Sequence, residues 1–173
     1  RRNSTVPVVM TRAEVRAVLD ELTGDKWLIV SLLYGCGLRL MEALRLRIKD
    51  LDFARKEVTV REAKGGKGRV TVLPASLVTT LQKHLRAVKA IHQGDLAVGW
   101  GRVVMPGALD RKYPDASTEW RWQWVFPQAK RWKNTKTGEE GRHHVHETLV
   151  QRAVKEAVSR AGVVKRVGCH TFR

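Results

Sequence analysis

The segment Gly37-Leu38-Arg39-Leu40-Met41-Glu42 organises this chain, because it joins two predicted helices through a glycine turn. A further glycine, Gly35, stands just before it, and the residues from Arg39 to about Leu46 have the composition of a helix. Glu42 lies one helical turn after Arg39, where its carboxylate can orient the guanidinium. The segment therefore predicts a charged pair at the start of a helix.

Apolar periodicity on both sides of this segment predicts further helices. Thr11 and Glu14 form a T-x-x-E capping box that begins a helix. An apolar run predicts a second, largely buried helix over 27–34, and amphipathic patterns predict helices over 76–92 and 147–161. Most of the chain is therefore expected to be helical.

Residues 57–63 and 69–73 alternate between apolar and polar side chains, which is typical of strands. Lys64-Gly65-Gly66-Lys67-Gly68 between them supplies turn residues, so the pattern predicts a β-hairpin with two lysines at its tip. The expected fold class is α+β, dominated by helices, with a small antiparallel β-sheet.

The charge of the chain indicates its partner. Thirty-three Lys and Arg oppose 17 Asp and Glu, a net charge of +16, which favours polyanions and above all nucleic acid. Two cysteines far apart suggest neither a disulfide framework nor a zinc ribbon and fit a reduced cytoplasmic setting. No apolar run reaches the roughly 18 residues of a membrane span, so no membrane is expected as a partner.

Four basic side chains stand where they could act on a phosphodiester: Arg39, Lys67, His170 and Arg173. Arginine forks match phosphate oxygens in bidentate geometry, and they stabilise the charge of a pentacoordinate transition state. A lysine near the leaving oxygen can act as general acid. Such a site needs no cofactor or metal. Taken singly, each of these groups is more typical of a solvated surface role, and only their ordered combination favours catalysis.

That combination, Gly-Leu-Arg-x-x-Glu, Lys-Gly-x-Lys-x-Arg-x-x-x-x-Pro and His-x-x-Arg, resembles the tyrosine recombinase (phage integrase) family from Thr11 to Arg173. The resemblance implies that Arg39, Lys67, His170 and Arg173 are catalytic and that Glu42 orients Arg39. It also implies a tyrosine nucleophile, a 3′-phosphotyrosine intermediate with a free 5′-hydroxyl, a Holliday junction, and a tetramer assembled on DNA.

The chain departs from that pattern at its end. The family continues after His-x-x-Arg to a further His or Trp and then to the nucleophilic tyrosine, whereas this sequence stops at Arg173. Tyr34 and Tyr113 fit neither the order nor the setting, and Tyr34 is expected to pack in the core. We expect residues 1–10 to be a linker or entry segment and 11–173 to be a catalytic domain without its nucleophile. Without a core-binding domain as well, it should bind DNA weakly and not cleave it.

Four of the six tryptophans lie between residues 120 and 132. Residues 119–127 predict a strand with Trp120, Trp122 and Trp124 on one face, and 128–145 predict a loop. A shared tryptophan face is compatible with core packing or with stacking on nucleobases that are not paired in a duplex. Both interpretations stay open at this point.

Three segments resemble a region peculiar to integron integrases: Ala108-Leu109-x-Arg111-Lys112-Tyr113-Pro114, Trp122-Gln123-Trp124-Val125-Phe126-Pro127 and Arg142-His143-His144-x-His146-Glu147. The resemblance implies recognition of a folded single strand of a cassette recombination site through extruded bases, besides a duplex site. The side chains expected to contact that DNA are Trp122, His143, His144, Lys64, Arg69 and Arg142, with Trp122 and His144 stacking on bases.

Other interpretations compete with this one. Within the enzymes, a phage or Xer-type integrase shares the catalytic motifs, and a non-catalytic DNA-binding module could keep the fold. A zinc site is a further alternative, with His143, His144, His146, Cys169 and His170 as possible ligands, although their spacing does not match the usual ligand pairs.

Overall fold

The structure is a computed structural model that describes residues 8–61, 68–107, 109–138 and 140–173. Its helices are α1 (Arg12–Asp20), α2 (Gly24–Cys36), α3 (Leu40–Leu44), α4 (Ala75–Ala97), α5 (Leu109–Lys112) and α6 (Glu147–Arg160). Short 3-10 turns are η1 (Ile48–Asp50), η2 (Ala116–Thr118), η3 (Trp120–Trp122) and η4 (Cys169–Phe172). The strands are β1 (Leu51–Asp52), β2 (Glu57–Val60), β3 (Arg69–Val72), β4 (Pro127–Lys133) and β5 (Glu140–His144). Helices dominate, and both sheets are antiparallel, which confirms the predicted fold class.

The first helices begin and end as their sequences predict. The Thr11 hydroxyl accepts the Glu14 amide at 3.2 Å, and the Glu14 carboxylate accepts the Thr11 amide at 2.7 Å, which completes the capping box. Helix α2 is central, with every residue from Leu28 to Leu33 buried. It ends at Gly37, whose φ of 62° lies in the left-handed region that favours glycine.

Tyr34 corrects one expectation, because its side chain is 45% exposed instead of packed in the core. It follows the buried run of α2, and Gly35 beside it is exposed as well, whereas Cys36 is buried again. One side of an apolar helix can thus face solvent near its end, even when the preceding turns are wholly buried.

The predicted hairpin forms the second and third strands of a sheet with the order β1-β2-β3. Val58 pairs with Thr71 and Val60 with Arg69, and both of these valines are buried beneath the sheet. The Thr71 hydroxyl donates to the carbonyl of Cys36 at 2.9 Å, so β3 is tied to the end of α2.

Two predictions for the tryptophan region were wrong. Residues 120–122 form the 3-10 turn η3 instead of a strand, and residues 127–144 contain the β4–β5 hairpin instead of a loop. The side-chain amide of Gln123 fixes the turn by donating to the carbonyls of Gly101, Ser117 and Glu119. Such partners are far from the local pattern, so alternation alone misassigned the segment.

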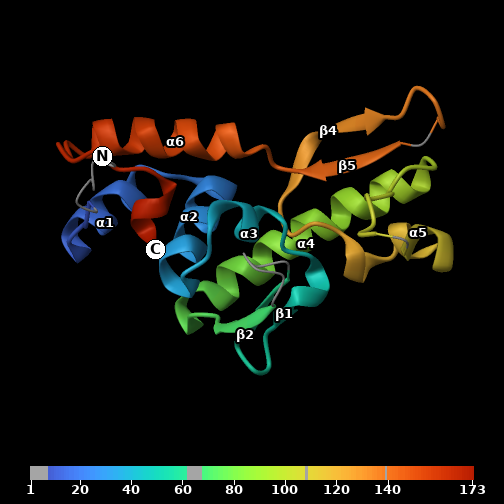
Figure 1. Cartoon of the computed structure of the whole chain (residues 1–173), viewed down its shortest axis with the longest axis horizontal. Helices are drawn as coiled ribbons and strands as arrows, with labels where there is room; N and C mark the ends of the chain where they lie inside the picture. Colours follow the sequence, from blue (N-terminus) through green and yellow to red (C-terminus); the bar gives the residue numbers. More distant parts are fainter. Residues whose placement is uncertain (1–7, 62–67, 108, 139) are drawn as a thin grey trace, which may run out of the picture.

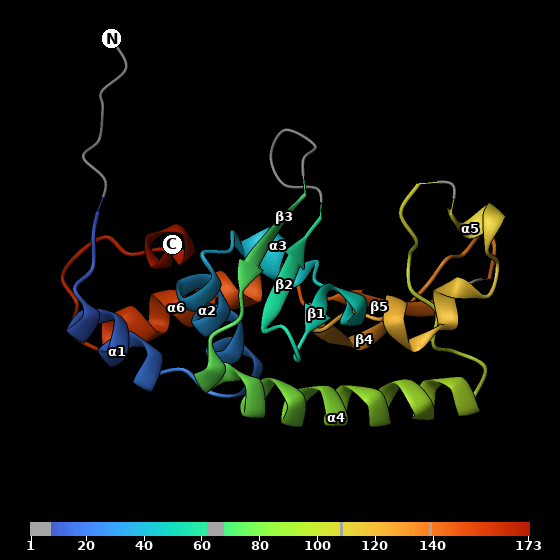
Figure 2. The ribbon, with the colours of Figure 1, turned by 90° about the horizontal axis from the view of Figure 1, so that it is seen from below.

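Helix α4 runs along the length of the molecule (Figure 2). Its first half places Leu77, Leu81 and Leu85 in the main core with α1, α2, α3 and α6. A smaller cluster of Val103, Met105, Ala116 and Trp124 lies in the region that precedes the β4–β5 hairpin. Figure 1 shows this hairpin extending away from α6, beside the second half of α4. Within the described ranges, no helix is long and apolar enough to cross a membrane.

Candidate active site and adjoining cavity

A buried carboxylate organises the start of α3. Arg39 is the N-cap residue, and its backbone amide donates to Glu42 Oε2 at 2.8 Å while its Nη1 donates to Glu42 Oε1 at 2.8 Å. Arg69 of β3 donates from Nη1 at 2.9 Å and from Nη2 at 2.8 Å to the same carboxylate. The Glu42 side chain is only 7% exposed. The hydrogen bonds from Arg69 lower the pKa of Glu42 to about 2, because together with those from Arg39 they outweigh the opposing effect of burial.

The carbonyl of Gly37 brings a third arginine to the same place. It accepts Arg69 Nη2 at 3.3 Å and Arg173 Nε at 3.1 Å. Arg173 follows η4, which packs against α2, so residues 136 positions apart meet at the end of that helix. Figure 2 shows η4 and α3 on the side of the molecule away from α4. We call Arg39, Arg69 and Arg173, with Glu42, the arginine cluster.

His170 lies in η4, three residues before Arg173, and is exposed. The predicted helix opening is a 3-10 turn, and the Arg173 amide that follows it donates to the carbonyl of His170 at 3.4 Å. Lys64 and Lys67 lie outside the described residues. The structure therefore brings together Arg39, Glu42 and Arg173, with His170 on the adjoining turn, and adds Arg69 to them.

A cavity of about 520 Å³ adjoins the cluster. It begins at Met41 and Glu42 and extends to aromatic side chains from the region after α5. Trp122, Trp124, His143 and His144 line that part, so three of the residues predicted to contact DNA share one cavity. Trp120 does not line it. It lies 5.9 Å from His92 of α4 between ring centroids, because η3 turns neighbouring tryptophans in different directions.

Cations cover the tryptophan rings of this cavity. Lys49 Nζ lies 3.0 Å from the Trp122 ring centroid, and Arg47 Cζ lies 3.7 Å from that of Trp124. Arg47 also donates to the carbonyl of Trp122 at 2.7 Å, which holds the turn against η1. Burial, together with the nearby charge of Arg61, lowers the pKa of Lys49. These contacts place positive charge on aromatic faces.

The two histidines of β5 are also held by aromatic rings. His144 meets the Trp124 ring edge-on at a centroid distance of 5.3 Å, and His143 stacks on Trp132 at 5.2 Å. Burial lowers the pKa of His143, and the neighbouring His144 adds to that effect. Imidazole and indole rings are suited to contact a flat, weakly polar ligand. No three His, Cys, Asp or Glu side chains among the described residues are grouped so as to hold a metal ion.

Sequence reasoning missed several residues of this region. Arg47 and Asp50 repeat the spacing of Arg39 and Glu42, and the Asp50 carboxylate accepts the Arg47 amide at 2.9 Å. This second R-x-x-acid motif was a usable signal. Asp95, which binds Arg131 and Arg142, also had a usable signal, because it is the sole acidic residue between Glu62 and Asp110.

Comparison with known proteins agrees with this geometry. Residues 9–173 match the sequence model of the phage integrase family. The chain belongs to this family, the tyrosine recombinases.

Two individual relatives show how similar the chain is to known recombinases. The chain is 43% identical over 173 residues to an integrase/recombinase of Escherichia coli, covering all of this chain and 51% of that protein. It is 41% identical over 85 residues to the tyrosine recombinase XerA of Pyrococcus furiosus, covering 47% of this chain and 30% of XerA. The chain thus spans about half the length of the Escherichia coli relative it matches.

Solved structures show the same fold. A crystal structure of XerA recombinase matches with a TM-score of 0.59 and 21% identity, over 99% of this chain and 49% of that one. The integrase of mycobacterium phage Brujita matches with a TM-score of 0.60 and 20% identity, over 99% and 43%. At these identities the similarity concerns the fold alone.

Proposed function

We propose that this chain is the phosphate-binding part of a site-specific DNA recombinase. The observation that carries the proposal is the arginine cluster. The Glu42 carboxylate accepts hydrogen bonds from Arg39 and Arg69. The Gly37 carbonyl accepts hydrogen bonds from Arg69 and Arg173. A backbone phosphate is the anion that such a group accommodates, because arginine forks match its oxygens. The net charge of +16 favours DNA over other polyanions of lower charge density.

The proposed roles follow the family's motifs. Arg39 and Arg173 bind the scissile phosphate, Glu42 fixes Arg39, and His170 supports the same oxygens. A tyrosine oxygen attacks phosphorus and forms the 3′-phosphotyrosine, while Lys67 protonates the departing 5′-oxygen. The role of Lys67 rests on its order in the motif. Four copies of the full-length protein would assemble on two DNA sites.

Strand cleavage by the full-length gene product tests these roles. A nicked duplex that releases its 5′ end traps the covalent DNA–protein adduct. Arg39→Ala is expected to lower adduct formation by about a hundredfold or more, as for the loss of other groups that stabilise transition-state charge. Arg121→Ala is the control, because Arg121 is exposed and pairs with the exposed Glu119 in its own segment. Adduct formation by Arg39→Ala at the normal rate would refute the assignment.

We propose further that the cavity receives a base extruded from a folded single strand, as in the integration and excision of integron cassettes. Trp122, Trp124 and His144 supply ring surfaces, and Lys49 supplies a cation beside them. Its volume of about 520 Å³ has room for a nucleobase. The cavity adjoins Glu42, so an extruded base would lie next to the bound phosphate backbone.

Binding of this chain to two matched probes tests base recognition. Both are the same folded single strand, one with an extruded base and one with that base removed. Trp122→Ala is expected to cost the first probe about 5- to 100-fold in affinity, the range of a base–aromatic stack, and to leave the second nearly unchanged. Equal binding of both probes by the unaltered chain would favour a Xer-type recombinase, the second candidate, which the identity to XerA supports.

A further inference from the structure

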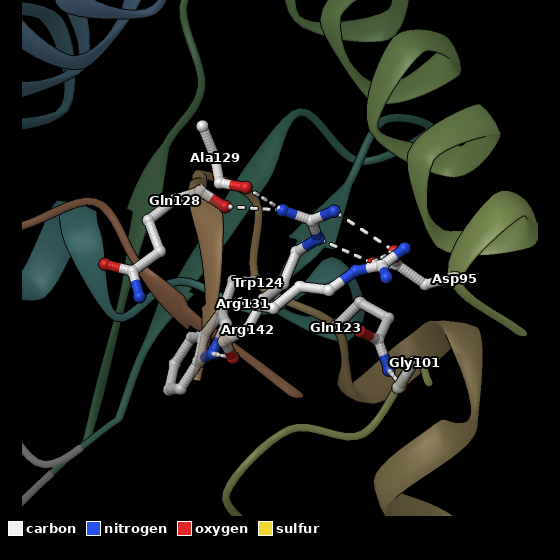
Figure 3. A network of polar contacts seen from close by, with 8 residues as sticks. All are labelled: Asp95, Gly101, Gln123, Trp124, Gln128, Ala129, Arg131 and Arg142. Atoms are coloured by element: carbon white, nitrogen blue, oxygen red, sulfur yellow. Dashed lines mark hydrogen bonds and ion pairs between the residues drawn. The ribbon is translucent and has the colours of Figure 1, made fainter. Parts of the chain in front are cut away.

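A second buried carboxylate holds the β4–β5 hairpin to α4. Asp95, in the last turn of α4, has a side chain only 4% exposed. Its Oδ1 accepts Arg131 Nη2 at 2.6 Å and Arg131 Nε at 3.0 Å from β4, and also Arg142 Nη2 at 3.0 Å from β5. Its Oδ2 accepts Arg142 Nε at 2.5 Å (Figure 3). One acid therefore binds both strands of the hairpin.

Arg142 has its hydrogen-bonding capacity directed into the protein. Besides Asp95, its Nη1 donates to the carbonyl of Gln128 at 3.1 Å and to that of Ala129. The side chain is 16% exposed. The sequence predicted Arg142 to contact DNA, but in this arrangement each of its nitrogens is engaged within the domain.

Like charges across the hairpin make the carboxylate necessary. Arg131 and Arg142 are directly opposite each other in the β4–β5 register, and like charges at such positions destabilise a pair of strands. Burial raises the pKa of Asp95, but the hydrogen bonds from Arg142 and Arg131 outweigh that effect and lower it overall. The acid is therefore ionised at neutral pH, and its charge offsets the repulsion.

The network continues into the wall of the cavity. The carbonyl of Arg142 accepts Trp124 Nε1 at 3.2 Å, and its amide donates to the carbonyl of Arg102 at 3.2 Å. His143 and His144 follow directly on β5, and both line the cavity together with Trp124. The position of β5 thus determines where the ring surfaces of the cavity lie.

We propose that Asp95 is a positioning residue that sets the cavity's selectivity for an extruded base. It pairs Arg131 and Arg142 and so holds β5, with its histidines and with Trp124, in the geometry that accepts the ring. This inference rests on the proposed function of the cavity. Asp95 itself does not line the cavity, so it acts through the hairpin and not by touching DNA.

Asp95→Asn removes the charge and keeps the shape of the side chain. Its matched control is Glu140→Gln, which breaks the ion pair between Glu140 and Lys133 across the same hairpin. Both side chains of that pair are more exposed than Asp95. Without DNA, Asp95→Asn is expected to raise amide hydrogen exchange about tenfold or more over 122–144 and to leave α1 and α2 unchanged. The control is expected to change exchange only near its own position.

Selectivity is the second measurement, taken as the ratio of affinities for the extruded-base probe and the probe without that base. Asp95→Asn is expected to lower this ratio about tenfold, while Glu140→Gln stays within about twofold. In a Trp122→Ala background, the same substitution is expected to have little further effect, because the two residues act on one event.

Each outcome has a defined meaning. A ratio that Asp95→Asn leaves unchanged overturns the inference and leaves base recognition standing. Equal binding of both probes by the unaltered chain refutes base recognition and, with it, the selectivity role of Asp95. If Asp95→Asn unfolds the domain, Arg131→Gln replaces it, because Arg142 then keeps its pair. That variant is expected to show faster exchange in the hairpin and a partly lowered ratio, and an unchanged ratio would refute the proposal.

Discussion

Replacing Glu42 by glutamine tests whether one carboxylate holds the arginine cluster together. Its pKa of about 2, against an ordinary value of 4.5, corresponds to about 3 kcal/mol of stabilisation at neutral pH. Arg39 and Arg69 are each about one-third exposed, so water screens part of this interaction. We therefore expect Glu42→Gln to lower the free energy of unfolding by about 2–3 kcal/mol at pH 7.

The dependence on pH identifies the cause. The folded-state pKa lies below the unfolded one, so the stabilisation is complete above pH 4.5 and is lost as the pH falls toward 2. The difference in unfolding free energy between the native chain and Glu42→Gln should thus shrink to about 1 kcal/mol at pH 3. Urea titrations at pH 7, 5, 4 and 3, followed by tryptophan fluorescence, measure it.

The control is Glu119→Gln, which breaks an exposed pair with Arg121 and should cost less than about 0.5 kcal/mol. A stability difference for Glu42→Gln that stays constant from pH 7 to pH 3 would refute the reasoning. In that case, a change in hydrogen bonding or packing that does not depend on the charge of Glu42 would account for the loss.

Other substitutions separate chemistry, backbone strain and packing. Arg173→Ala in the full-length product should lower strand cleavage about a hundredfold or more while DNA affinity falls less than about tenfold; a parallel loss in gel-shift and cleavage assays would contradict its role at the phosphate. Gly37→Ala should lower the free energy of unfolding by about 1–2 kcal/mol, because the φ of Gly37 is 62°. Gly94 has open space around it in α4, so Gly94→Ala should raise the free energy of unfolding by about 0.5–1 kcal/mol. Melting temperatures that shift in the same direction in both variants would argue against backbone strain. Leu81→Ala, in the main core, should cost about 2–5 kcal/mol in urea unfolding, and a loss below 1 kcal/mol would show that the core can collapse around the gap.

The parts of the fold that the sequence predicted depend on local signals. The capping box of Thr11 and Glu14 fixes the start of α1 within four residues, and glycine and lysine at 64–68 separate two alternating runs that form β2 and β3. The pair of Arg39 and Glu42 is equally local, because its spacing is one helical turn. Each of these interactions is complete within a short window of chain.

The β4–β5 hairpin could not be predicted in that way. Its residues are polar and basic, and strands are poor in such residues when nothing offsets the charge. What offsets it is Asp95, which lies 36 positions before Arg131 and 47 before Arg142. The information that makes this segment a hairpin is therefore held in α4.

In the candidate site, too, the local motifs were predicted from the sequence, whereas the tertiary contacts were not. The motif order suggested that Arg39 and Arg173 act together. In the structure, Arg173 donates to the carbonyl of Gly37, two residues before Arg39, and Arg69 donates to the same carbonyl. Arg69 was expected to contact DNA, but both of its terminal nitrogens donate hydrogen bonds to Glu42 and Gly37. A charged residue in a hairpin can serve DNA directly or through another side chain, and only the tertiary partner distinguishes these two roles.

Scarce acids therefore have a specific importance in this basic domain. Glu42 and Asp95 are both nearly buried, and each carboxylate binds two guanidiniums from different segments. In a chain with 33 basic residues and 17 acidic ones, neighbouring arginines repel each other unless a carboxylate lies between them. An exposed lysine can be replaced with little effect on geometry, because salt and water screen it. Loss of either of these two acids leaves a pair of partly buried cations without compensation, and the surface that we propose receives DNA would change its shape before any DNA arrived.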